Sequence, residues 1–283
     1  MINPPSIPWL DLCSLCGQGG SGTVWIARDP SGISRAVKVI PHGQSTGKER
    51  QAVSTYRRNI PHHPSLIDIF FAGDTDTCFY YVMELADNAS ATRGEYIPDT
   101  LAYRIQKNRL QPAEILHLMQ KITSGVAALH SQGFAHRDLK PENILFVHGE
   151  PKIGDPDLLS SLDHCSSSGT PEYLPNHPCS AEQQDLHALG KLLYCMFTGE
   201  DPEAFPALPE DLPHDQIILL NRIALCCCDM IYPYTDIREL QKNLELTEKK
   251  ITTAIRPQLK ILNTDFLRSL TLKFPLLCRF RQG

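Results

Sequence analysis

The residues best suited to chemistry lie near the middle of the chain. The run from His136 to Asn143 (HRDLKPEN) sets a carboxylate, an ammonium and a side-chain amide close together, and a further carboxylate follows in the run Lys152-Ile153-Gly154-Asp155. Phosphoryl transfer needs a carboxylate to orient the attacking hydroxyl, a cation near the moving phosphate and oxygen ligands for magnesium. The sequence therefore predicts phosphoryl transfer, with these candidate residues: Asp138, Lys140, Asn143 and Asp155.

A glycine-rich segment lies near the start of the chain. Residues Gly17 to Val24 (GQGGSGTV) fit the pattern GxGxxGxV. Such glycines let a backbone approach phosphate oxygens closely, but they also occur in ordinary hairpins. In a dinucleotide-binding fold the pattern opens a helix, whereas here Val24-Trp25-Ile26 continues as a strand. A glycine-rich hairpin that covers a ligand therefore fits better than a Rossmann turn.

Lys38 interrupts an apolar run from Arg35 to Ile40. Burying an unpaired ammonium is costly, so this lysine needs an anion unless it lies on a solvent-exposed face. The glycine-rich segment ends at Val24, 14 residues upstream. That neighbour favours a lysine that holds nucleotide phosphates.

Two kinds of element must position these residues. Runs rich in β-branched and aromatic residues predict a small, mostly antiparallel sheet, with a helix over Lys48 to Asn59 between the second and third runs. The strands are expected at Thr23–Ala27, Arg35–Ile40, Leu66–Ala72 and Phe79–Leu85. After residue 100 the apolar spacing becomes helical, with Pro112 near the start of one helix, Gly133 just past its end, and a second helix before Gly199. Residues 86–96 are the expected connector.

Composition restricts the class of partner. The 27 basic and 32 acidic side chains give a formal charge of −5 over 283 residues, which argues against nucleic acid as the principal ligand. No run of about 18 apolar residues occurs, and the first residues contain prolines without a basic region before an apolar core. We therefore expect no membrane span, a cytoplasmic protein, and a protein or small-molecule partner.

The ten cysteines are scattered, and we expect them to be thiols. Cys13 and Cys16 form a CxxC pair, but a structural zinc site needs a second spaced pair. The adjacent Cys226, Cys227 and Cys228 lack that spacing.

With these motifs in this order, residues 10–245 resemble the eukaryotic-like (Hanks-type) Ser/Thr protein kinases. In the details of the motifs they resemble the bacterial branch of that family. Three further segments support the resemblance: YVMEL at Tyr81–Leu85, GTPEY at Gly169–Tyr173 and DLHALG at Asp185–Gly190. The resemblance implies a bilobal α+β fold with a β-rich N-lobe and a helical C-lobe. The implied units are an N-terminal extension (1–9), the N-lobe (10–86), the C-lobe (87–246) and a C-terminal extension of unassigned role (247–283).

The resemblance also implies roles for individual residues. Asp138 would be the catalytic base and Lys140 the neighbouring cation, while Asn143 and Asp155 would bind magnesium. Lys38 would contact the α and β phosphates of ATP and pair with a helix glutamate, for which Glu49 is the candidate, 11 residues away. The remaining ATP contacts would come from the glycine-rich hairpin, the strand before Lys38 and the hinge: Gly17, Gly19, Gly22, Val24, Ala36, Met83, Glu84 and Ala86.

The chain departs from the family pattern in two places. Asp155-Pro156-Asp157 replaces Asp-Phe-Gly and keeps the carboxylate that would bind the metal. The proline and the second aspartate restrict the usual change of backbone conformation in this segment. Asp157 also adds a carboxylate beside the metal site. Alternatively, Pro156 fills the same apolar gap and leaves magnesium binding intact. Leu174 to Pro178 replaces the Ala-Pro-Glu segment, and the arginine that normally pairs with its glutamate is missing near Met230 to Pro233.

These observations lead to two hypotheses about function. The first is an ATP- and magnesium-dependent Ser/Thr protein kinase acting on a protein substrate. The alternative is a nucleotide-binding pseudokinase that serves as an interaction or scaffold module, and a kinase for a small metabolite is less favoured. The sequence leaves the substrate and the oligomeric state open.

Arg137 offers a possible regulatory contact, because it precedes Asp138 and a serine-rich loop follows Asp155. A phosphate on Ser160, Ser161, Ser166, Ser167 or Ser168 would pair with its guanidinium. Asp163 is the alternative partner, and an unmodified turn is the third reading.

Overall fold

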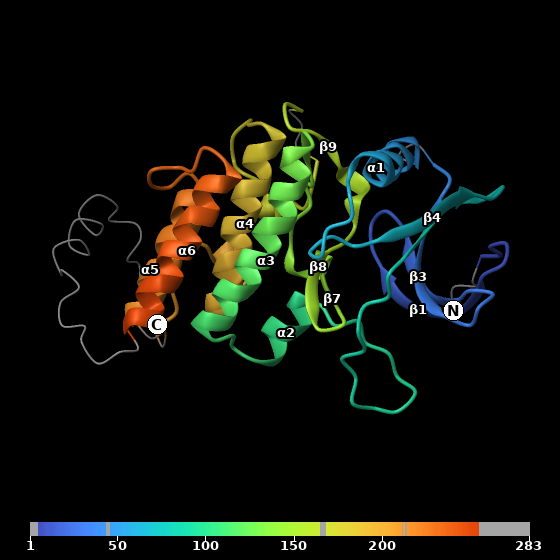
Figure 1. Cartoon of the computed structure of the whole chain (residues 1–283), viewed down its shortest axis with the longest axis horizontal. Helices are drawn as coiled ribbons and strands as arrows, with labels where there is room; N and C mark the ends of the chain where they lie inside the picture. The colour runs from blue at the N-terminus through green and yellow to red at the C-terminus, as the bar shows by residue number, and fades with distance from the viewer. Residues whose placement is uncertain (1–4, 44–45, 165–167, 211, 213, 255–283) are drawn as a thin grey trace.

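The computed structural model describes residues 5–43, 46–164, 168–210, 212 and 214–254. A sheet-rich lobe built from the first part of the chain lies beside a lobe of packed helices (Figure 1). This arrangement confirms the expected bilobal α+β fold.

The N-terminal lobe is an antiparallel sheet with the strand order β1-β2-β3-β5-β4. Its strands are β1 (Asp11–Gln18), β2 (Thr23–Arg28), β3 (Ser34–Pro41), β4 (Ile69–Asp74) and β5 (Cys78–Met83). The last four match the predicted runs to within a few residues. The sequence did not predict β1, because its Asp, Cys, Ser and Gly residues lack the β-branched and aromatic side chains typical of strands.

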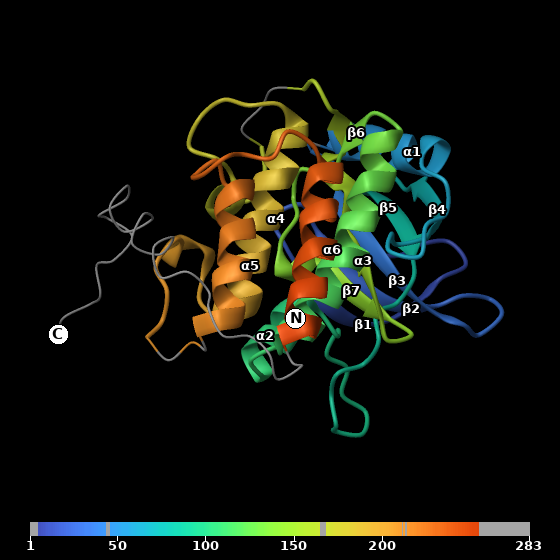
Figure 2. The ribbon, with the colours of Figure 1, turned by 60° about the vertical axis from the view of Figure 1, so that its left-hand side comes forward.

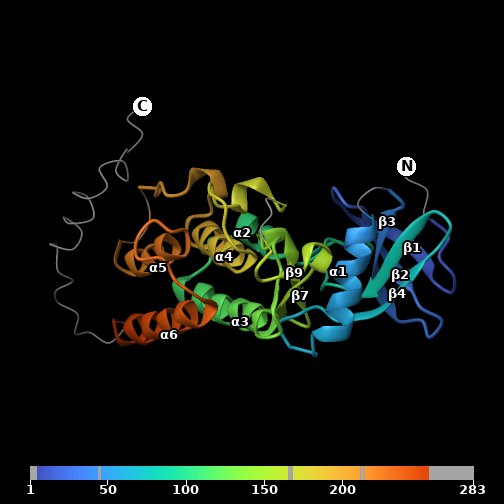
Figure 3. The same cartoon turned by 90° about the horizontal axis from the view of Figure 1, so that it is seen from above.

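The two faces of this sheet bury different side chains, because successive residues of a strand point to opposite faces. Val37 and Val39 belong to one apolar cluster, together with Trp25. Ala36 and Ile40 belong to the other cluster, which includes Val53 of the helix α1 (Thr46–Asn59). Lys38 shares the parity of Ala36 and Ile40, so it faces the side of the sheet along which α1 runs (Figure 3).

The C-terminal lobe contains the helices α2 (Leu101–Lys107), α3 (Pro112–Ser131), α4 (Ala181–Thr198), α5 (His214–Cys227) and α6 (Ile237–Ala254). Figure 2 shows α3, α4, α5 and α6 packed side by side, and their apolar faces form the main core of the molecule. The helix α4 begins with a capping box between Ser180 and Gln183 and ends at Gly199. The helix α6 continues past the expected boundary at residue 246, and residues 255–283 lie outside the described part of the chain.

Short strands and turns follow α3 in the C-terminal lobe. Strand β6 (Phe134–Ala135) pairs with β9 (Ser160–Ser161), and β7 (Ile144–Val147) forms a hairpin with β8 (Glu150–Ile153). The 3-10 turns span Pro141–Asn143, Pro156–Leu158, Pro171–Tyr173 and Pro202–Ala204. Each of these turns begins with proline, which has no backbone N–H to satisfy and suits the first position of a helical turn. Asn143, Asp155 and Thr170 lie on or directly before the first three of these turns.

Candidate active site

Asp138 is the acceptor of a dense set of hydrogen bonds. Its Oδ1 accepts from the Thr170 hydroxyl at 2.6 Å, and its Oδ2 lies 3.0 Å from Lys140 Nζ and 2.9 Å from Asn143 Nδ2. Burial favours the neutral acid, but the Thr170 hydroxyl and the Lys140 ammonium outweigh it and lower the pKa of Asp138. Asp138 is therefore an ionised carboxylate at neutral pH.

A buried carboxylate on α4 holds the backbone of this loop. Asp185 is fully buried and accepts the N–H groups of His136 and Arg137 at 2.9 and 2.7 Å. Its Oδ2 also lies 2.8 Å from Nε2 of His130 on α3. Sequence reasoning used Asp185 only as part of a supporting motif and missed this role. The available signal was an acidic residue four and seven positions before Leu189 and Leu192, on the apolar face of α4.

Lys38 lies in a buried cluster of polar side chains. Its Nζ contacts Asp155 Oδ1 and Asp157 Oδ2 at 2.5 and 2.6 Å, and its exposed fraction is 4%. Burial works to lower the pKa of Lys38, but the two carboxylates outweigh it and raise that pKa. Lys38 also lowers the pKa of Asp155 against the effect of burial. Burial and the neighbouring Asp155 raise the pKa of Asp157 to about 6 against the effect of Lys38, so at neutral pH the cluster holds an ammonium between two carboxylates.

A cavity of about 160 Å³ lies between the lobes. Most of the predicted nucleotide-binding and metal-binding residues line it, namely Gly17, Val24, Ala36, Lys38, Met83, Glu84, Ala86, Asn143 and Asp155. Gly22 lies instead directly before β2, beside the end of β3, and a Cβ there would be 2.1 Å from the Val39 carbonyl oxygen. This position therefore requires glycine, whereas Gly19 has open space around it.

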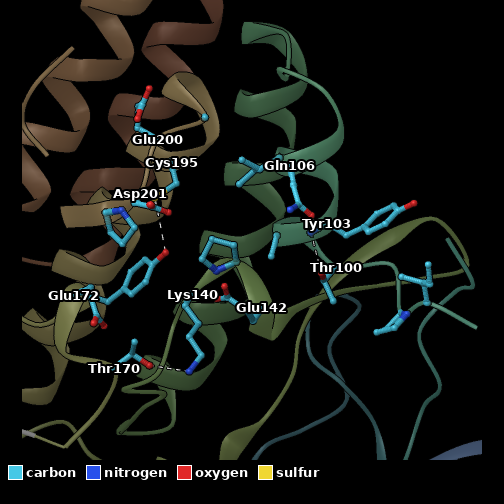
Figure 4. A pocket seen from close by; sticks show the side chains of 18 residues that line it. Thr100, Tyr103, Gln106, Lys140, Glu142, Thr170, Glu172, Cys195, Glu200 and Asp201 are labelled. Carbon is cyan, nitrogen blue, oxygen red and sulfur yellow. Dashed lines mark hydrogen bonds between the residues drawn. The ribbon is translucent and has the colours of Figure 1, made fainter. Parts of the chain in front are cut away.

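A second and larger cavity, of about 850 Å³, lies on the C-terminal lobe. Figure 4 shows Lys140 and Thr170 at one end, joined by a hydrogen bond of 2.7 Å, with Glu142 nearby. Glu200 and Asp201 come from the segment after α4. This groove is long, acidic and adjacent to the Asp138 hydrogen-bond network.

The comparisons with known proteins agree with this geometry. Residues 11–249 match the family model described as "Protein kinase domain". This chain belongs to the protein kinase family.

The relatives of this kinase domain come from bacteria and eukaryotes. Serine/threonine-protein kinase PrkC of Bacillus subtilis is 29% identical over 207 residues, which is 68% of this chain and 30% of that protein. Serine/threonine-protein kinase pkn2 of Myxococcus xanthus is 30% identical over 66% of this chain and 24% of that protein. The human NUAK family SNF1-like kinase 2 is 32% identical over 74% of this chain and 32% of that protein. The kinase domain thus spans about a third or less of the length of these relatives.

The structure of the kinase domain corrects one expected contact. Glu49 lies on α1 as predicted, but among the described residues Lys38 forms no ion pair with it. Glu49 is buried, and its Oε2 has no hydrogen-bond partner in the described part of the chain. Lys38 pairs instead with Asp155 and Asp157, because the turn Pro156–Leu158 packs beneath α1 and brings these carboxylates to the lysine.

The hinge of the kinase domain is fixed by a side chain as well as by its backbone. Glu84 accepts the Asp68 N–H at 2.8 Å and forms an ion pair of 2.8 Å with Lys152 on β8. The Ala86 carbonyl accepts from the Tyr96 hydroxyl at 2.9 Å. The Glu84 side chain thus joins the hinge to the C-terminal lobe, a role that the sequence did not indicate.

The first departure from the family pattern has a defined conformation. Asp155 has φ 56° and ψ 64°, a left-handed conformation that Asp tolerates better than most residues. Pro156 is buried and starts the turn that packs against α1. The additional carboxylate, that of Asp157, is 6% exposed and forms an ion pair with Lys38.

The serine-rich loop is described in part. Arg137 Nη1 donates to the Ser160 hydroxyl and Nη2 to the Ser168 carbonyl, both at 3.4 Å. Its Nε donates to the Gln184 side chain at 3.3 Å. Residues 165–167, which include Ser166 and Ser167, lie outside the described residues, so phosphorylation in this loop stays a prediction.

Among the described residues, no helix combines the length and the apolar character needed to cross a membrane.

Proposed function

We propose that this kinase domain is an ATP- and magnesium-dependent Ser/Thr protein kinase of the bacterial branch, which transfers the γ-phosphoryl group to protein hydroxyls. One observation carries the proposal. Asp138 contacts both Lys140, which lines the acidic groove, and Asn143, which lines the cavity between the lobes. A carboxylate in this position can receive a hydroxyl from the groove and direct it towards a phosphate in the cavity.

In this proposal, Asp138 orients the substrate hydroxyl and accepts its proton. Its lowered pKa keeps it ionised at neutral pH, as an acceptor must be. Lys140 supplies positive charge beside the reacting phosphate, and its hydrogen bond to Thr170 fixes the position of the ammonium.

The chemistry of Asn143 and Asp155 fits magnesium. Asn143 Nδ2 donates to the Asp138 carbonyl and carboxylate, which leaves its amide oxygen for a metal ion. Asp155 supplies a carboxylate whose pKa Lys38 holds low, and magnesium prefers such oxygen ligands. When bound, magnesium neutralises the developing charge on the phosphate oxygens. Lys38 then holds the α and β phosphates.

The groove supports a polypeptide as the acceptor. Its volume of about 850 Å³ and its elongated lining, from Tyr103 on α2 to Asp201 beyond α4, suit an extended chain. A small metabolite would leave most of it empty.

The nucleotide-binding pseudokinase remains a second candidate, because one observation favours it. Lys38 and Asp155, the residues proposed to hold phosphate and metal, contact each other, and Asp157 adds a second carboxylate. In a pseudokinase these contacts would persist when nucleotide binds, so that no transfer would follow.

Transfer of labelled phosphate separates the two candidates. The purified protein is incubated with labelled ATP, magnesium and a generic basic protein, alongside Asp138→Asn, Lys38→Met and Asp155→Ala. The proposal expects labelling by the wild type, its loss in all three variants, and retained ATP affinity in Asp138→Asn. ATP binding without wild-type labelling would support the pseudokinase instead.

A further inference from the structure

The polar cluster around Lys38 includes a tyrosine that the proposed mechanism does not use. Tyr81 lies directly opposite Lys38 in the β3–β5 register, and its side chain is fully buried on the same face of the sheet. Its hydroxyl donates to Asp157 Oδ1 at 3.0 Å and lies 3.4 Å from Asp155 Oδ1. Tyr81 and Lys38 therefore hold Asp157 through different oxygens.

The glycine-rich hairpin contacts the same carboxylate. The Ser21 hydroxyl donates to Asp157 Oδ2 at 3.2 Å. Asp157 thus accepts from β3, from β5 and from the tip of the hairpin, three separate parts of the N-terminal lobe.

The two carboxylates around Lys38 are not equivalent. Asp155 lines the cavity, and its side chain is 32% exposed, so it is free to turn to a metal ion. The Asp157 side chain is 6% exposed and does not line the cavity. A buried ammonium still needs a counterion when Asp155 turns to magnesium. Asp157 is placed to remain that counterion.

We propose that Asp157, rather than the helix residue Glu49, is the positioning residue that fixes Lys38 for the nucleotide phosphates. The Asp157 carboxylate substitutes for the ion pair that usually joins this lysine to the helix. As a consequence, α1 is tied to the site by packing on the turn Pro156–Leu158, and among the described residues no ion pair joins it to Lys38. The phosphate-contacting role of Lys38 rests on the proposed function, whereas the pairing itself does not.

Steady-state kinetics test the positioning role. Asp157→Asn keeps the shape and removes the charge, so we expect KM for ATP to rise about tenfold, equivalent to ~1.4 kcal/mol of lost binding, with a smaller change in kcat. Glu49→Gln should raise KM for ATP less, and Asp76→Asn, on the exposed β4–β5 turn, serves as the matched control. An unchanged or lowered KM in Asp157→Asn, or a larger rise in Glu49→Gln, would overturn the proposal.

A second variant covers the case in which Asp157→Asn fails to fold. Tyr81→Phe keeps the aromatic ring in the core and removes the hydroxyl that holds Asp157 Oδ1. We expect KM for ATP to rise about threefold, equivalent to roughly 0.7 kcal/mol, with kcat retained. A KM equal to that of the wild type would contradict a role for Asp157 in fixing Lys38.

A double-mutant cycle on thermal unfolding measures the pairing of Lys38 with Asp157 in the absence of nucleotide. The melting temperature is measured for Lys38→Met, Asp157→Asn and Glu49→Gln, singly and in the two pairs with Lys38→Met. We expect a non-additive shift for the Asp157 pair and an additive one for the Glu49 pair. The reverse pattern would overturn the proposal even in a wild type that transfers no phosphate. Absence of transfer alone would count against the proposed function.

Discussion

The hydroxyl of Thr170 donates a hydrogen bond of 2.6 Å to the carboxylate of Asp138 and accepts another, of 2.7 Å, from Lys140 Nζ. Thr170 belongs to the segment before the turn Pro171–Tyr173, whereas Asp138 and Lys140 flank Leu139 in the loop after β6. One hydroxyl therefore joins the segment that lines the acidic groove to the proposed catalytic base. The position of the base depends on the conformation of both segments.

Thr170→Ala should reduce turnover without weakening ATP binding. Loss of the hydroxyl removes one hydrogen bond from Asp138 and one from Lys140, so that only their mutual contact and Asn143 hold the base. Misplacing a catalytic group by about 1 Å can cost on the order of 100-fold. We expect kcat to fall about tenfold to hundredfold, with KM for ATP and the melting temperature nearly unchanged. Thr170→Ser, which restores a hydroxyl, should recover most of kcat. Equal kcat values for Thr170→Ala and the wild type would show that the hydroxyl does not position the base.

Gly22→Ala should weaken nucleotide binding, because the new methyl group would meet the Val39 carbonyl oxygen at 2.1 Å and lift the hairpin from β3. We expect KM for ATP to rise about tenfold, or ~1.4 kcal/mol. Gly20→Ala is the matched control, since a Cβ there has nothing within 4 Å. Similar KM values for the two variants would mean that the hairpin tolerates displacement.

Basic peptides should be the better substrates. Glu142, Glu200 and Asp201 line the groove beside Lys140 and Thr170, so positive side chains near the acceptor hydroxyl gain favourable electrostatic energy there. Two peptides that differ in Lys or Gln beside the serine would be compared by KM at low and high salt. We expect the lysine peptide to have the lower KM and its advantage to shrink with salt. Glu142→Gln should reduce that advantage, and a preference for the glutamine peptide would contradict the expectation.

His187 should make the protein less stable in acid. Burial, with a smaller effect of Lys191, lowers the pKa of His187 to about 4, and neither ring nitrogen has a hydrogen-bond partner among the described residues. The unfolded chain takes up a proton below about pH 6.5 while the folded state resists it, so stability is present above that pH and is lost as pH falls towards 4. Between pH 7 and pH 5 this loss should be on the order of 2 kcal/mol.

Urea unfolding at pH 7 and pH 5 measures this effect. His187→Leu should lose less free energy of unfolding between the two pH values than the wild type does. The same substitution at His117, exposed on α3, controls for a change of one histidine. Equal losses in His187→Leu and the wild type would exclude His187 as the source.

Much of the fold and of the site could be predicted from the sequence, because the signals are local. Four strands and the helices α1, α3 and α4 follow from side-chain type and periodicity. Strand β1 was not predicted, because its residues are poor strand formers. Lys140 and Asn143 lie within five residues of Asp138, so their spacing along the chain already brought them together, whereas Thr170 comes from 32 residues further along. The identity of the family followed from the order of these motifs.

The partner of Lys38 was decided by the tertiary structure. Glu49 is the nearer candidate along the chain, whereas Asp157 is 119 residues away. Sequence spacing favours the near residue, but an ion pair depends on which side chains the packed lobes bring within reach. Lys38 and Tyr81 share a face of the sheet through the strand register, and the turn Pro156–Leu158 places Asp157 beneath both. Neither relationship is encoded in a local period, because both arise only when the sheet, α1 and the turn pack against one another.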